Sequence, residues 1–203
     1  MLHTSFYLLR QGGPCQRAYR ALSCHLGGIH EYGLTKPIPY SVGLENLDKF
    51  DIDDVIWALP HCEESELDRM YNLAGRLVTE TLEHFTAARG GSFDLTPNLA
   101  RARDCIVNGE AQSPVALKLY ADLTGDAADF HNRFKDTPIY RRAMWVTNFA
   151  QFTLAHGVVP ANPELIVCKA DDCLALAEFA FGGDSDAGPR WFVARLLHLL
   201  DEV

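Results

Sequence analysis

Cysteine and histidine residues near the N-terminus are the first side chains of this sequence whose types suggest chemistry. Cys15, Cys24, His25 and His30 lie close together along the chain. Structural zinc sites pair their ligands as C-x2-4-C or H-x3-5-H, and only the gap between His25 and His30 is near such a spacing. The pattern therefore favours a helix face that carries a buried thiol and exposed imidazoles over a metal site.

A second candidate is the thiol of Cys62, which follows His61 and precedes Glu63 and Glu64. The N-terminus of a helix lowers the pKa of a thiol, but neighbouring carboxylates raise it again. A cysteine nucleophile also needs a base within hydrogen-bonding reach. We interpret Cys62 as a thiol at a corner between two helices.

Carboxylates cluster in two later stretches, ADLTGDAADFHNRF and the loop GGDSDAGPR. Helical di-metal sites use Glu-x-x-His, which this chain lacks, and the loop lacks the closing glutamate of a calcium site. There is also no phosphate-binding loop, no G-x-G-x-x-G and no G-x-S-x-G. The sequence thus predicts no catalytic residue, metal or cofactor, and it favours a protein that is not an enzyme without excluding one.

The net charge of −9 is concentrated in one part of the chain. Residues 45–83 carry eleven acids and three cations, whereas residues 1–44 have a net charge of +3. Acidic domains are poor ligands for nucleic-acid phosphates, so the candidate partner is another protein with a basic surface. A purely solubilising acidic face is the alternative. The candidate partner-binding residues are Asp51, Asp53, Asp54, Glu63, Glu64, Glu66, Glu80 and Glu83.

The element that must position these acids is a long helix predicted over Glu63–Gly91. Its apolar residues recur at i, i+3, i+4 and i+7, which is the period of a helix with one buried stripe. The helical wheel places Leu67, Ala74, Val78 and Phe85 toward the core. It places charged residues, among them Arg76 and Glu80, toward solvent.

Turn residues divide the remaining chain into helices. A helix is expected between Gly12-Gly13-Pro14 and Gly27-Gly28, an extended connector over residues 29–47, and a short helix over about Asp51–Leu59. Later Xaa-Pro pairs, such as Thr137-Pro138, mark further helix starts. The predicted fold is all-α: one domain over residues 1–203, with residues 1–112 and 113–203 as alternative halves. It contains about seven or eight antiparallel helices.

Aromatic residues of the last helices give a competing hypothesis. They could line a pocket of a helical enzyme or a small-ligand-binding protein, although ordinary core packing explains them equally well. The residues concerned are Tyr120, Phe130, Phe134, Tyr140, Trp145, Phe149 and Trp191.

Composition indicates an ordinary soluble protein, with 48% hydrophobic and 22% charged residues. No apolar run reaches the length of a membrane-spanning helix, and the first residues do not resemble a secretory signal. The six cysteines form no dense framework, so we expect reduced thiols, a cytoplasmic location and no membrane partner.

Four phrases of the chain together resemble a known family. They are GGPCQRAYRAL, KPIPYSVGLENLDKFDIDDVIWALP, LAGRLVTETLEHF and LARARDCIVNGEA. Their order over roughly residues 12–112 is similar to helical bacterial and phage-associated proteins classed with the immunity proteins of polymorphic toxin systems. The shared features are Asp53-Asp54 before Trp57-Ala58-Leu59, then Leu82-Glu83-His84-Phe85, then Ala102 to Glu110. The resemblance implies a helical, protein-binding antagonist and assigns no catalytic residue.

The sequence therefore predicts a non-enzymatic helical protein that binds another protein through an acidic face and acts as an immunity-like antagonist. Charge complementarity would steer a basic partner to that face. The alternatives are the aromatic-pocket protein described above and a structural subunit that forms a homodimer.

Overall fold

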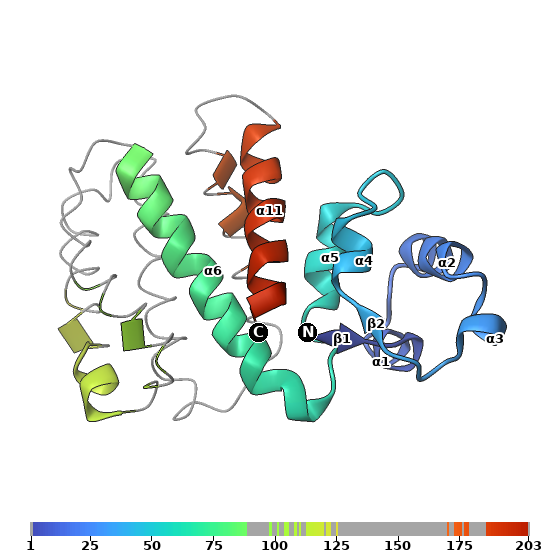
Figure 1. The fold of residues 1–203 in the computed structure, drawn as a ribbon, viewed down its shortest axis with the longest axis horizontal. Coiled ribbons are helices and arrows are strands. Elements are labelled where there is room, and N and C mark those ends of the chain that lie inside the picture. The colour runs from blue at the N-terminus through green and yellow to red at the C-terminus, as the bar shows by residue number, and fades with distance from the viewer. Residues whose placement is uncertain are drawn as a thin grey trace.

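Helices dominate the computed structural model of this chain (Figure 1). It describes residues 2–88, 98, 101, 104–105, 108, 110, 113–119, 121–122, 125, 170, 173–175, 177–178 and 186–202. In chain order the elements are β1 (His3–Thr4), α1 (Phe6–Gln11), α2 (Gln16–His25), α3 (Ile29–Tyr32), β2 (Ile38–Pro39), α4 (Ser41–Leu44), α5 (Ile52–Ala58), the 3-10 helix η1 (Glu64–Glu66), α6 (Leu67–Ala88) and α11 (Ala187–Glu202).

Helices α6 and α11 lie side by side and form the centre of the core (Figure 1). The buried stripe of α6 is formed by Met70, Leu73, Ala74 and Leu77, and that of α11 by Phe192, Leu196, Leu199 and Leu200. These residues recur at three- and four-residue intervals, so each helix buries one face. Among the described residues, no helix is both long and apolar enough to span a membrane.

The first residues of the chain are anchored in the core by a short strand pair. Strand β1 runs antiparallel to β2, with His3 opposite Pro39 and Thr4 opposite Ile38. Leu2 and Phe6 flank β1, and neither side chain is exposed. The ring of Phe6 meets the rings of Tyr19 and Tyr32 edge to face, with centroids 5.5 and 6.1 Å apart. These ring contacts connect α1, α2 and α3 as one N-terminal unit.

Helix α2 packs loosely, since none of its residues is fully buried. Glycines flank it on both sides, and Gly27 and Gly28 have φ values of 81° and 98°, which only glycine adopts readily. The Tyr19 hydroxyl donates to the Phe6 carbonyl at 3.2 Å, and the Arg17 guanidinium pairs with Asp51. Two side-chain tethers thus hold a helix whose apolar face covers the body of the protein.

The predicted helical character is confirmed, and so are the helices at residues 16–25 and 52–58. The predicted connector at residues 29–47 is wrong, because it contains α3, β2 and α4. Of the α6 residues that we expected to face the core, Ala74 is buried and Leu67 is partly buried against the core. The side chains of Val78 and Phe85 lie outside the described part of the structure. Arg76 and Glu80, which we expected to face solvent, are largely covered by α11, with side chains 18% and 14% exposed.

Candidate binding site beneath helix α2

A cavity of about 70 Å³ lies between α2 and the β2–α4–α5 segment, and we refer to it as the α2 cavity. Its floor is buried and its rim is half-buried, so it opens toward solvent. The floor consists of Thr4, Leu9, Ile38, Tyr40, Phe50 and Val55. The rim consists of Pro14, Ala18, Tyr19, Leu22, Pro39, Gly43, Asp54, Trp57 and Ala58.

The polar groups of the floor already have partners within the protein. The Tyr40 hydroxyl donates to the Leu59 carbonyl at 3.1 Å, and the Thr4 hydroxyl donates to the His61 carbonyl at 2.5 Å. Burial raises the pKa of Tyr40 well above its ordinary value, so the phenol stays neutral. Because these donors are satisfied, the floor presents apolar surface to an occupant.

Gly43 sets the depth of the α2 cavity at its α4 side. A Cβ atom at this position would come within 2.8 Å of a methyl group of Val55. Helices α4 and α5 therefore approach more closely than a side chain would permit.

One acid of the first turn of α5, Asp54, lies at the rim. Arg17 of α2 pairs with Asp51 and lies 3.6 Å from Asp54, and the hydrogen bond that Arg17 donates to the Asp51 carboxylate raises the pKa of Arg17. Asp53 is exposed and forms no ion pair within the described part of the chain. Acids favour the positive end of a helix, which explains part of this cluster, and the Arg17 contacts explain more.

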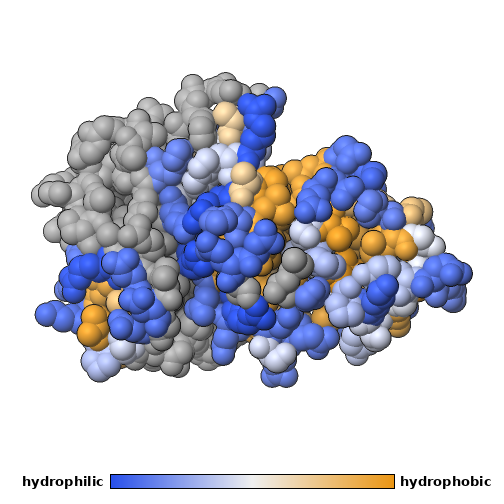
Figure 2. Space-filling model, viewed as in Figure 1, coloured by the Kyte–Doolittle hydropathy of each residue, from blue (hydrophilic) through white to orange (hydrophobic). Residues whose placement is uncertain are grey.

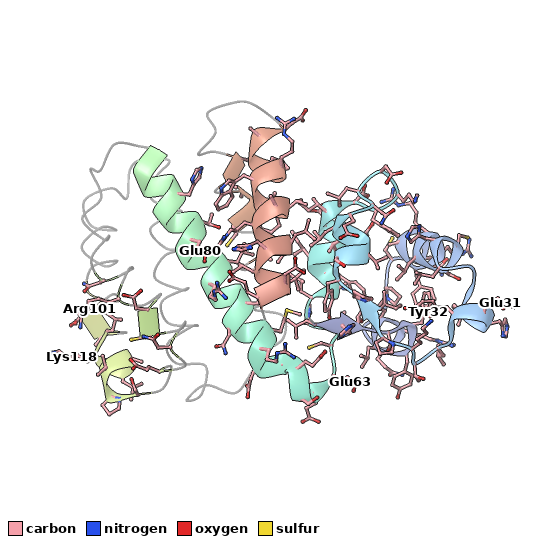
Figure 3. The ribbon with its side chains drawn as sticks, in the orientation of Figure 1. Glu31, Tyr32, Glu63, Glu80, Arg101 and Lys118 are labelled. Carbon is pink, nitrogen blue, oxygen red and sulfur yellow. The ribbon has the colours of Figure 1, made fainter. Side chains whose placement is uncertain are left out.

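The acids predicted to bind a partner fall into different environments. Glu63 and Glu64 are exposed after the end of α5, and Figure 3 shows Glu63 at the start of η1 and α6. Glu66 lies 3.8 Å from the His3 imidazole. Glu83 belongs to α6, but its side chain lies outside the described part of the structure. The acids available to a partner are therefore Asp53, Glu63 and Glu64.

Glu80 belongs to a cluster between α6 and α11, which we call the Glu80 cluster. Its carboxylate accepts a hydrogen bond from the Arg195 guanidinium and lies 4.0 Å from that of Arg76. Arg76 also pairs with Glu202, which lies 3.0 Å from His198. The pKa of Arg195 is raised by the Glu80 bond and that of Glu202 is lowered by Arg76. These contacts give Glu80 a role in joining two helices.

The thiols near the N-terminus are placed differently from the prediction. Cys15 and Cys24 are free and exposed, at the two ends of α2, so neither is the buried thiol expected there. Backbone N–H groups of Ala18 and Arg17 lower the pKa of Cys15. Within the described residues, no three cysteine, histidine or acidic side chains come together as metal ligands would.

Cys62 is a buried thiol at the corner between α5 and η1. Burial, followed by the charge of Glu66, raises its pKa to about 11. A thiol that stays protonated at neutral pH is a poor nucleophile. Beside it, burial lowers the pKa of His61, whose ring packs on Trp57 with centroids 4.4 Å apart.

The stability of the protein should fall as the pH rises from 9 to 11, because burial favours the neutral Cys62 thiol. A raised folded-state pKa stabilises the protein below the unfolded-state value of 9.0, and that contribution disappears as the pH passes the folded-state value of about 11. The expected loss is about 2 kcal/mol. Urea unfolding at pH 7, 9 and 11 measures it. The variant Cys62→Ala, as the control, should lose less; an equal loss would assign the effect to other groups such as Tyr40.

Most of the predicted aromatic pocket lies outside the described residues. That part comprises Tyr120, Phe130, Phe134, Tyr140, Trp145 and Phe149. Trp191 is half-buried in α11 and stacks on His84 with centroids 4.7 Å apart. The pocket among the last helices stays a prediction.

The residues around the α2 cavity were missed by sequence reasoning, apart from Asp54. Their signal is spread over four short segments of the first 58 residues, and none of these segments shows a motif. The two glycine doublets, Gly12-Gly13 and Gly27-Gly28, were the one indication in the sequence, because glycines on both sides give a helix conformationally permissive connections.

Comparisons with known proteins give no match: no family model, no curated protein and no solved structure is significantly similar to this chain.

Proposed function

We propose that this chain binds another protein, and that the partner inserts one apolar side chain into the α2 cavity while its basic residues face the acids at the ends of α5. The observation that supports this most directly is the cavity itself, with a buried apolar floor and a carboxylate at its rim. Figure 2 shows hydrophobic surface gathered over α4, α5 and the side toward α2.

The size of the cavity favours a side chain over a free ligand. About 70 Å³ is roughly half the volume of the engineered 150 Å³ cavity that binds benzene. Space of this size suits one aliphatic side chain, and a few buried anchors near the centre of an interface carry most of its binding energy. Full burial of such a side chain contributes about 1.5–3 kcal/mol.

The charge around the cavity favours a basic partner. Asp53 is exposed at the start of α5, and Glu63 and Glu64 are exposed after its end. Acids at both ends of one helix would attract lysine or arginine residues that flank the anchor, and would mainly speed association. Asp51 and Asp54 contribute less because Arg17 offsets them, and Glu66 contributes less because its side chain is mostly covered.

We also propose an overall architecture and a class of binding protein for this chain. We take the chain to be one domain over residues 1–203, a bundle of about seven or eight antiparallel helices. The resemblance of roughly residues 12–112 to immunity proteins of toxin systems supports an antagonist as the particular kind of binding protein. A toxin with a basic, apolar-tipped segment would be the matching partner.

Synthetic peptides test the anchor directly. We expect an acetylated peptide with a central leucine between lysine pairs to shift the NMR signals of Ala18, Val55 and Ala58. The substitution Ala18→Leu fills the cavity and should weaken binding about tenfold. The same change at the exposed Ala194 of α11 is the matched control and should leave binding unchanged.

Two further peptides and one charge-reversal variant distinguish the contribution of charge to binding from that of the apolar anchor. A peptide with a central serine should bind at least tenfold more weakly, and one with flanking glutamates should not bind. Asp53→Lys should reduce association at low salt, whereas Asp201→Lys on α11 should not. Equal binding of the leucine and serine peptides would exclude the anchor, and equal binding of the glutamate peptide would exclude the acidic face.

A further inference from the structure

Two of the four cations in residues 1–44 are held by other groups. Arg17 pairs with Asp51, and the Lys36 ammonium lies 4.3 Å from the centre of the Tyr32 ring. The other two, Arg10 and Arg20, are exposed, and neither forms an ion pair within the described part of the chain. Both residues line the same depression.

This depression, which we call the basic hollow, lies on the side of α2 toward α1 and α3 and has a volume of about 730 Å³. Its lining residues are Arg10, Pro14, Gln16, Tyr19, Arg20, Ile29, His30, Gly33 and Leu34. No aspartate or glutamate is among them. Glu31, the acid of α3, lies at the outer edge of the unit (Figure 3).

The volume of the basic hollow suits a whole small molecule. Ligand sites typically measure about 300–1,000 Å³, and the hollow falls within that range whereas the α2 cavity is far below it. Apolar side chains line part of it: Pro14, Tyr19, Ile29 and Leu34, of which Leu34 is 39% exposed. An occupant with an apolar body would cover these groups.

The two guanidinium groups define the other half of the ligand. Arginine presents a planar fork of donors that matches carboxylate or phosphate oxygens and forms strong charge-assisted hydrogen bonds with them. The Gln16 amide and the His30 imidazole add further donors to the same surface. A hollow with four such groups and no acid is complementary to an anion.

We propose that the basic hollow binds a small organic anion, namely a carboxylate or phosphate group attached to an aromatic or aliphatic body. Arg10 and Arg20 hold the anionic head, and Tyr19, Ile29 and Leu34 cover the body. This site is separate from the α2 cavity, and its occupancy does not require the protein partner.

Titration of the full isotope-labelled chain with four probes of similar size tests the proposal. The probes are phenyl phosphate, phenylacetate, 2-phenylethanol and 2-phenylethylamine. We expect the two anions to shift the NMR signals of Arg10, Gln16, Arg20 and His30, and the neutral and cationic probes to leave them in place. Tighter binding of phenyl phosphate would assign the head group as a phosphate, and tighter binding of phenylacetate as a carboxylate.

Substitutions link the signal to the two arginines. Arg10→Gln and Arg20→Gln should each weaken anion binding about tenfold, because each removes one charge-assisted contact. Lys36→Gln, which removes a cation outside the hollow, should leave the affinity unchanged. Both arginines are exposed, and unchanged thermal unfolding would verify that the variants fold. The proposal fails if the neutral probe binds as tightly as the anions, or if the arginine variants retain wild-type affinity.

Discussion

The substitution Glu80→Leu is expected to lower the free energy of unfolding by about 3 kcal/mol, at the lower end of the range for breaking a buried ion pair. The leucine leaves two guanidinium groups, those of Arg76 and Arg195, without the carboxylate that lies between them. Their side chains are only 18% and 27% exposed, so water replaces the lost partner poorly. Urea unfolding followed by circular dichroism measures the loss.

Two control variants separate the buried anion from surface charge. Glu202→Gln removes a carboxylate that is 39% exposed and should cost less than 1 kcal/mol. Arg195→Met in the Glu80→Leu background should recover part of the stability, because it removes the stranded cation and leaves an apolar pair. If Glu80→Leu and Glu202→Gln lose the same free energy of unfolding, the Glu80 cluster contributes no more stability than a surface ion pair.

The substitution Gly188→Ala is expected to lower the free energy of unfolding by about 3 kcal/mol, the upper end of the range for overpacking. A Cβ atom here would lie 2.5 Å from the Glu178 backbone nitrogen and 2.8 Å from the Ala177 carbonyl carbon, and it would also overlap the Glu178 Cα atom. Backbone atoms cannot rotate aside as a side chain does. Helix α11 must therefore move away from residues 177–178, and thermal or urea unfolding measures the effect.

Gly125→Ala provides the matched control, since nothing lies within 4 Å of a Cβ at this helical glycine. Here alanine should raise stability by up to about 1 kcal/mol, as it does in exposed helices. The glycine-to-alanine substitution is thus expected to lower stability at position 188 and to raise it at position 125. A stabilising effect of Gly188→Ala would mean that α11 packs less closely on this segment than the structure shows.

Long helices were predictable from the sequence because each repeats its pattern several times. The α6 pattern extends over 22 residues, so the period is evident. Strand β1 has two residues and α1 has six, too few for any period to appear. Consequently Leu2, Phe6 and Leu9, which are core residues, had no detectable signal.

The orientation of α6 was less predictable than its existence. Which face of a helix is buried depends on the neighbours that cover it. The partner of Glu80, Arg195, lies 115 residues further along the chain. Charged residues at positions 76 and 80 are typical of a solvated face when no neighbour is known. Helix α11 covers them and supplies the opposite charge.

Of the candidate binding site, the sequence indicated only the high density of acidic residues near α5. The sequence shows a high density of acids over residues 45–66, but the pairing of Asp51 with Arg17 depends on a contact across 34 residues. The α2 cavity combines β2, α4 and α5, two of which lie in the segment predicted as a connector. Short segments assembled by tertiary packing carry no local signature of the surface that they create.

Pro14 and Tyr19 line both the α2 cavity and the basic hollow, so α2 is a wall that the two sites share. No residue of this helix is fully buried, so we expect an occupant on one side to restrict the position of α2 on the other. With both proposed sites occupied, the two affinities are thermodynamically linked, and reciprocity requires each ligand to change the affinity of the other by the same factor. On the two proposals together, a small anion would act as an effector of partner binding.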